Sequence, residues 1–171
     1  MCSSDLFHAS DTMKSETEKT IIEILYYSDV PAEIWKGKLI EYWFHDQTPD
    51  LHTCRPHMDF DEARWFSQTE EERAATPFEE YQSPLSVVFM LLCENLKGGD
   101  ICISTIEVMK DTTKFYDIPV SVKFSPVQKM PAVEGKIYQF EGSRWYHWTS
   151  EIEEGRRVSL TLNFWDVNNE E

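Results

Sequence analysis

Residues 157–164, RVSLTLNF, alternate between polar and apolar side chains without a break. The polar positions are Arg157, Ser159, Thr161 and Asn163, and the apolar positions are Val158, Leu160, Leu162 and Phe164. Because successive side chains of a β-strand point to opposite faces of its sheet, this period of two predicts a strand with two unlike faces. The apolar face must pack on a core, whereas the polar face either meets water or lines a cavity.

Several other short segments also favour strands, and turns rich in Gly, Pro and Asp separate them. They cover residues 39–44, 85–93, 101–109, 120–124, 136–141 and 144–148. A helix is expected before them, over residues 15–27, where isoleucine and leucine are grouped at helical spacing. This order predicts a mainly β fold, a double-stranded β-helix (jelly roll) with the N-terminal helix packed on one sheet.

The length of 171 residues suits one domain of ordinary size. Residues 1–12 are polar and are interpreted as a loose tail, so residues 13–171 are expected to form a single jelly-roll domain. The N-terminus has no apolar segment typical of a signal peptide, and the four cysteines show no CxxC spacing. A reduced, cytoplasmic protein is therefore expected.

The charge balance is strongly acidic, with 31 Asp and Glu against 16 Lys and Arg and a net charge of −15. Such a chain is a poor partner for nucleic acid or for an anionic membrane, because both bind through basic residues. The longest apolar run, near residues 85–93, is also too short to span a bilayer. A small-molecule or peptide substrate is the expected partner, and no pattern indicates an oligomeric state.

The tripeptide His57-Met58-Asp59 places an imidazole and a carboxylate two positions apart. In an extended strand these two side chains share one face, so both can reach a single metal ion. His147 is the candidate for a third ligand from a distant strand. Two histidines and one carboxylate on one face of a metal are typical of non-haem Fe(II) oxygenases.

Arg157 and Ser159 also stand two positions apart, on the polar face of the alternating strand. An arginine inside a barrel needs an anion, because an unpaired buried charge is costly. A guanidinium beside a hydroxyl suits a carboxylate held by two parallel hydrogen bonds. The pair predicts a small carboxylate ligand next to the metal.

These motifs together resemble the Fe(II)- and 2-oxoglutarate-dependent dioxygenases, in particular their prolyl-4-hydroxylase-like branch. The resemblance extends over roughly residues 39–166 and includes the strand before His57, the Gly98-Gly99 turn and the segment 131–160. Three features depart from the pattern: arginine at 157 where the collagen-modifying members have lysine, threonine at 149 where valine is usual, and about thirty residues between Gly99 and Pro131, which suggest an extra hairpin.

The resemblance implies that His57, Asp59 and His147 bind Fe(II) and form the catalytic centre. It implies that Arg157 and Ser159 bind the distal carboxylate of 2-oxoglutarate as cosubstrate, with Tyr42 as a further donor and ascorbate as a reductant. The implied reaction is hydroxylation of an unactivated C–H bond of an amino acid, a small metabolite or a protein side chain. A carboxylate at Asp59 favours hydroxylation over halogenation, since halogenating members have a small residue there.

Two alternatives remain open at this stage. One is a non-catalytic jelly-roll module that binds a sugar or peptide through Trp43, Trp65, Trp145 and Trp148. The other is a cupin-type metalloenzyme, which usually uses more histidines than the five present here.

The acidic segment 61–83 follows directly from Asp59 and has too few apolar residues for a core helix. We expect it either to be a solvated surface helix or to be a lid over the site, together with residues 110–130.

Overall fold

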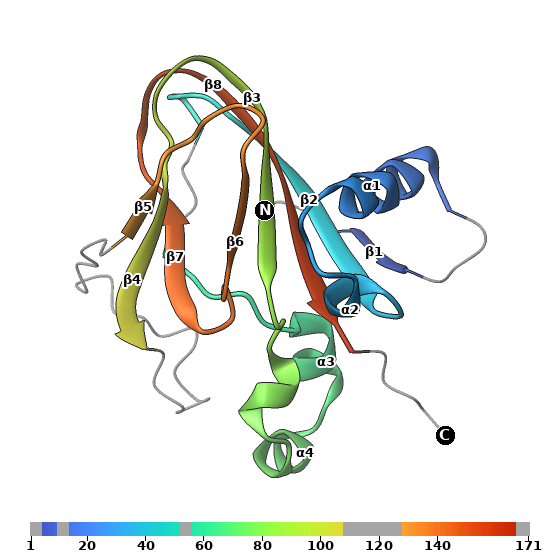
Figure 1. Ribbon diagram of the computed structural model, residues 1–171. Helices are drawn as coiled ribbons and strands as arrows, with labels where there is room; N and C mark the ends of the chain where they lie inside the picture. The colour runs from blue at the N-terminus through green and yellow to red at the C-terminus, as the bar shows by residue number, and fades with distance from the viewer. Residues whose placement is uncertain (1–4, 10–13, 52–55, 108–127, 167–171) are drawn as a thin grey trace.

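The computed structural model describes residues 5–9, 14–51, 56–107 and 128–166, and these ranges form two antiparallel sheets with a few short helices (Figure 1). The strands are β1 (Asp5–His8), β2 (Leu39–Gln47), β3 (Ser86–Gly98), β4 (Ile101–Glu107), β5 (Gln128–Met130), β6 (Ile137–Phe140), β7 (Trp145–Thr149) and β8 (Ile152–Trp165). The helices are α1 (Glu16–Tyr27), α2 (Ala32–Trp35), α3 (Glu62–Ser67), α4 (Glu70–Ala75) and the 3-10 helix η1 (Phe78–Tyr81).

One sheet has five strands in the order β1-β2-β8-β3-β6, and the other has three in the order β5-β4-β7. The expected mainly β, jelly-roll-like architecture is confirmed at this level. The predicted strand at 120–124 and most of the suggested extra hairpin lie outside the described residues. None of the helices in the described ranges is both long and apolar enough to cross a membrane.

The alternating strand is β8, which lies between β2 and β3 in the larger sheet. Its apolar residues Leu160, Leu162 and Phe164 face outward into a core cluster that also contains Ile21 and Leu25 of α1. Helix α1 is fixed at its start by a capping box between Ser15 and Glu18, which satisfies two backbone N–H groups. The N-terminal helix thus packs on the outer face of the five-stranded sheet, as the sequence predicts.

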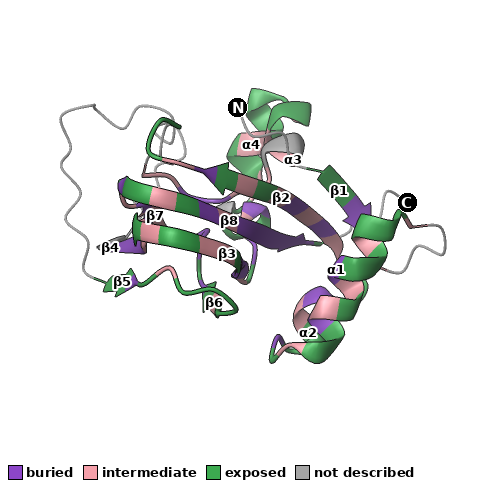
Figure 2. Cartoon of the chain, turned by 90° about the horizontal axis from the view of Figure 1, so that it is seen from above, coloured by how far each residue is buried: buried purple, intermediate pink, exposed green. Residues whose placement is uncertain are grey.

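The polar residues of β8 point the other way, into the space between the two sheets. Arg157, Ser159, Thr161 and Asn163 are all buried, and Figure 2 shows how buried residues run along this strand. A second apolar cluster occupies the same space, with contributions from β3, β4, β5 and β6. The polar face of the alternating strand therefore lines the interior of the protein and does not meet bulk water.

The N-terminal segment differs from its predicted form. Residues 1–12 were expected to be loose, but Asp5–His8 form β1, which pairs antiparallel with the start of β2. Phe7 is buried in the outer core cluster, so the pairing is supported by an apolar contact as well as by hydrogen bonds. A strand of four residues with one buried side chain carries too little periodicity to be recognised from sequence.

Candidate active site

The backbone of His57 is held beside β7. The His57 N–H donates to the His147 carbonyl at 3.0 Å, and the His147 N–H donates to the His57 carbonyl at 2.9 Å. Two residues further on, the Asp59 N–H donates to the carbonyl of Gly142 at 3.1 Å. These bonds keep residues 57–59 extended, so the imidazole and the carboxylate project from one face as predicted.

The three side chains converge on one point. Their candidate ligand atoms all lie within 4.8 Å of one another. His57 Nε2 lies 3.6 Å from Asp59 Oδ1, and His147 Nε2 lies 3.5 Å from Asp59 Oδ2. Ligands about 2.1 Å from one metal at right angles stand about 3 Å apart, so a small contraction would bring this group to bonding distance. The donor set fits a 2-His-1-carboxylate metal centre.

Neighbouring groups orient two of the three ligands. His147 Nδ1 lies 3.1 Å from the carbonyl oxygen of Trp145. Since a carbonyl can only accept, Nδ1 carries the proton and Nε2 presents a lone pair toward Asp59. Ser86 Oγ donates to Asp59 Oδ2 at 2.8 Å, and Asn163 also hydrogen-bonds this carboxylate.

Burial controls the charge of these ligands. It lowers the pKa of His147 to about 4, partly opposed by the attraction of Asp59. Burial would raise the pKa of Asp59, but the two histidines and the bonds from Ser86 and Asn163 outweigh it, so the pKa of Asp59 lies below its ordinary value. At neutral pH both side chains are in the deprotonated form that a metal ion requires.

Acid should therefore destabilise the metal-free protein. His147 and the cavity residue His45 both have a folded-state pKa of about 4, below the ordinary value of 6.5. Between these two pH values the unfolded chain binds more protons than the folded one. The contribution of these histidines to the free energy of unfolding is therefore fully present above pH 6.5 and is lost as the pH falls toward 4. The slope should reach about 1.4 kcal/mol per pH unit for each histidine. Urea unfolding at several pH values measures it, and equal stability at pH 7 and pH 5 would contradict this account.

Gly142 lies directly against the carboxylate of Asp59. A Cβ atom at this position would collide with both Ser86 Oγ and Asp59 Oδ2. We predict that Gly142→Ala weakens metal binding by roughly 10- to 100-fold, the usual effect of disturbing a residue that orients a ligand. Calorimetry with Mn(II) measures this. Gly37→Ala is the control: Gly37 has a positive φ, so alanine strains the backbone there, but nothing lies within 4 Å of the new Cβ. If both variants lose metal affinity equally, the collision with Asp59 does not explain the effect.

Arg157 and Ser159 lie in the same interior, 3% and 0% exposed. Arg157 Nη1 donates to Gln47 Oε1 and, at 3.5 Å, to Thr149 Oγ1. Ser159 Oγ has no hydrogen-bond partner within the described ranges. A buried guanidinium beside a buried hydroxyl with spare hydrogen-bonding capacity fits a carboxylate ligand.

A single small cavity joins the two halves of the site. It has a volume of about 40 Å³, and both His57 and His147 line it together with Arg157. A cavity of this size holds only about three water molecules. A five-carbon dicarboxylate could enter only if side chains moved, and the Gln47 amide oxygen already accepts from Arg157 Nη1.

Tyr42 lies on the side of its strand that faces away from this cavity. It is buried in the outer core cluster, where its ring packs edge-on against Phe7 with centroids 5.8 Å apart. Its neighbours on β2, Trp43 and His45, line the inner cavity instead. Because alternate residues of a strand face opposite sides, Tyr42 points to the outer core cluster, and its role as a cosubstrate donor stays a prediction that this orientation does not support.

The tryptophans do not form a common binding surface. Trp43 and Trp148 line the small inner cavity, and Trp145 lines a larger one. Trp65 lies in the 61–83 segment, where its ring packs against Tyr81 with centroids 5.1 Å apart. This distribution gives little support to a sugar- or peptide-binding module built on an aromatic face.

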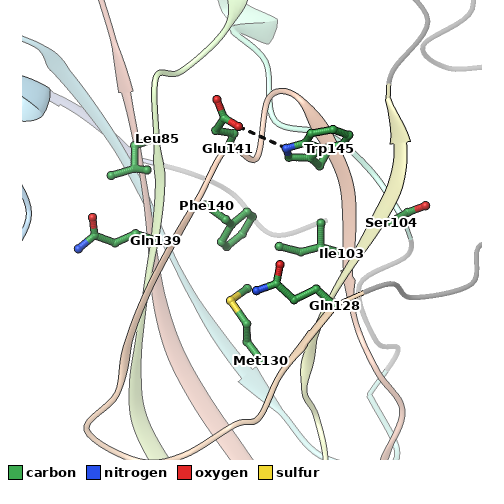
Figure 3. A pocket seen from close by; sticks show the side chains of 9 residues that line it. All are labelled: Leu85, Ile103, Ser104, Gln128, Met130, Gln139, Phe140, Glu141 and Trp145. Atoms are coloured by element: carbon green, nitrogen blue, oxygen red, sulfur yellow. Dashed lines mark hydrogen bonds between the residues drawn. The ribbon is translucent and has the colours of Figure 1, made fainter.

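A larger cavity, of about 760 Å³, is lined mainly by residues of β4, β5, β6 and β7 (Figure 3). Phe140 borders both cavities, and its ring centroid is 4.9 Å from that of His147. Ile103 also lines the larger cavity and is the cross-strand partner of His147. The rest of the lining is mixed: besides apolar side chains it includes the hydroxyl of Ser104, the amides of Gln128 and Gln139, and the carboxylate of Glu141, which accepts from Trp145 Nε1.

The segment 61–83 forms α3, α4 and η1 at the end of the sheets where β3 begins and β8 ends (Figure 1). The sequence predicts that it has too few apolar residues for a core helix, and Tyr81 of η1 is the one fully buried side chain described in this segment. The segment is tied to the β6–β7 turn, since the Ser83 N–H donates to Ser143 Oγ at 2.8 Å and Gln82 Nε2 donates to the Ser143 carbonyl at 3.1 Å. It is therefore more than a solvated helix.

The lid role of this segment stays a prediction. Hydrogen exchange over residues 61–83 should slow when substrate joins the complex of protein, iron and 2-oxoglutarate, because a closing lid protects its backbone amides. Trp65→Ala should uncouple 2-oxoglutarate consumption from substrate oxidation. Unchanged exchange together with normal coupling would contradict a lid.

Comparison with known proteins gives similarity to solved structures but not to a described family. No protein-family model matches the chain, and no curated protein matches it. Among solved structures, a prolyl-4-hydroxylase from Pseudomonas putida has a similar fold, with a TM-score of 0.47 and 11% sequence identity over 96% of this chain and 72% of that chain. A likeness this distant assigns no family, so the function is argued from the geometry of the site.

Proposed function

We propose that this protein is an Fe(II)- and 2-oxoglutarate-dependent oxygenase that hydroxylates an unactivated C–H bond. One observation supports the proposal: His57, Asp59 and His147 converge on a single point, and the two histidines line the same small cavity as the buried Arg157, two positions from the buried Ser159. A metal-binding triad alone would suit several kinds of protein. The buried guanidinium of Arg157 and the buried hydroxyl of Ser159 near the triad favour a ligand that carries a carboxylate.

Each residue has a defined part in this proposal. His57, Asp59 and His147 would hold the iron from one side and leave its other positions open to ligands. Arg157 would bind and orient the distal carboxylate of the cosubstrate, with Ser159 as a hydrogen-bond donor. When bound, iron and 2-oxoglutarate together supply the oxidative decarboxylation that drives C–H oxidation, and ascorbate is proposed as the reductant that maintains Fe(II).

The surrounding side chains would exclude water and admit substrate. Phe140 and Ile103 border the metal site and present apolar surface to the larger cavity. Pockets of about 300–1,000 Å³ are typical of small-molecule sites, and this one has about 760 Å³. We propose that the substrate, whether an amino acid, a small metabolite or a side chain of a peptide, lies in this cavity with its reacting carbon toward His147.

The test is turnover of the cosubstrate. Protein supplied with Fe(II), ascorbate and 2-oxoglutarate in air should form succinate slowly even without its substrate. The His147→Ala variant should show no more succinate than free iron does, because Nε2 of this residue is a proposed ligand. Absence of succinate from wild-type protein with iron bound would overturn the proposed function.

A further inference from the structure

We propose that His45 is a direct hydrogen-bond donor to the distal carboxylate of 2-oxoglutarate, in the role that the family resemblance gives to Tyr42. This inference rests on the proposed function and refines its cosubstrate site. It identifies a residue of β2 that the sequence pattern did not select.

The pairing of β2 with β8 places His45 at the anion site. In this antiparallel register His45 stands opposite Ser159, and Gln47 stands opposite Arg157. Residues directly opposite each other point to the same face with Cβ atoms about 5 Å apart, and diagonal neighbours are about 7–8 Å apart. His45 is therefore beside Ser159 and within reach of a ligand on Arg157, and it lines the same cavity.

The imidazole of His45 has the right chemistry for this position. Burial, reinforced by the positive charge of Arg157, lowers the pKa of His45 to about 4. A neutral imidazole still offers one N–H donor, and it adds no second positive charge to the interior. The ring of Trp43 packs edge-on against it with centroids 6.0 Å apart, which limits its orientations.

The distal carboxylate of the ligand also has a lone pair left for this donor. A carboxylate has about four lone-pair positions, and burying it is costly unless most of them are filled. The fork of Arg157 can fill two, and Ser159 Oγ, fully buried and without a partner in the described part of the chain, can fill a third. His45 is placed to fill the fourth, whereas Tyr42 faces the outer core cluster.

Anaerobic calorimetry of 2-oxoglutarate binding to Mn(II)-loaded protein tests the inference. His45→Phe keeps the ring but removes the N–H donor, so binding should weaken roughly 10- to 100-fold, as for a hydrogen bond to a charged group. His45→Gln keeps a donor and should recover most of the affinity. Tyr42→Phe is the matched control on the same strand and should bind as wild type does. Mn(II) affinity should be unchanged in all three variants.

A second ligand separates contact from a structural effect. The analogue 2-oxopentanoate has the same chain length but lacks the distal carboxylate, so its binding should be the same in wild type and His45→Phe. If both ligands lose affinity equally, or if neither does, the inference is overturned. It is also overturned if Tyr42→Phe weakens 2-oxoglutarate binding and His45→Phe does not. Failure of wild-type protein to bind 2-oxoglutarate at all would overturn the proposed function first.

Discussion

Replacing Asp59 with asparagine should reduce Fe(II) or Mn(II) affinity by about 100-fold or more, since even residues that only orient a ligand cost 10- to 100-fold. Asp59 is the only carboxylate of the triad, and each of its oxygens faces one of the two histidines. The amide keeps the size of the side chain and an oxygen that can accept from Ser86. A loss of affinity would therefore report the missing charge and not a cavity.

Asp46→Asn provides the matched control for this change. Asp46 is exposed on β2 and accepts two hydrogen bonds from Arg156, at 2.8 and 2.7 Å. It should bind metal as wild type does. Calorimetry under argon measures both variants, and wild-type affinity in Asp59→Asn would remove this residue from the metal site.

Replacing Arg157 with alanine should have the second large effect, on 2-oxoglutarate. Truncating one partner of a buried, charge-assisted pair costs about 2–5 kcal/mol, or roughly 30- to 5,000-fold in affinity. Ser159→Ala should cost about 1 kcal/mol, because only one hydrogen bond is lost. Arg157→Lys should fall between wild type and Arg157→Ala, since the charge stays but the two-pronged geometry is lost.

The neighbouring arginine is the natural control here. Arg156 precedes Arg157 on β8, is exposed and bonds Asp46, so it faces away from the cavity. Arg156→Ala should leave 2-oxoglutarate affinity unchanged. Equal affinity in wild type and Arg157→Ala, with metal binding intact, would show that Arg157 has a purely structural role.

The parts of the site that follow local periodicity were predictable from the sequence. His57 and Asp59, and likewise Arg157 and Ser159, stand two positions apart, and strand geometry puts each pair on one face. The structure groups His57 and Asp59 with His147, and it places Arg157 on the cavity that both histidines line, with Ser159 buried on the same strand. The apolar half of β8 likewise predicted a core contact, and Leu160 and Leu162 make it.

Tyr42 shows the limit of this reasoning. Residues 42–44 are three consecutive aromatics, Tyr-Trp-Phe, so the strand has no period of its own that assigns a face. The face is fixed only by pairing with β8, which a sequence read segment by segment does not contain. A shift of this pairing by one residue would turn Tyr42 toward the cavity and would turn Trp43 and His45 away from it.

The groups that support the ligands were also missed, because they come from distant parts of the chain. Ser86 and Asn163 face each other across β3 and β8 and reach Asp59 together. Gly142 meets the same carboxylate from the β6–β7 turn. Each is an ordinary residue in its own segment, and only the assembled sheets show its role.

Anaerobic titration of the Fe(II)-loaded protein with 2-oxoglutarate tests the central claim most directly, because one visible charge-transfer band requires iron and the keto acid to share a site. We predict that the band saturates at one 2-oxoglutarate per iron in wild-type protein. It should be absent in Asp59→Asn, which binds no iron tightly, and should need much higher 2-oxoglutarate in Arg157→Ala. Stoichiometric iron binding with no band at millimolar 2-oxoglutarate would contradict the account.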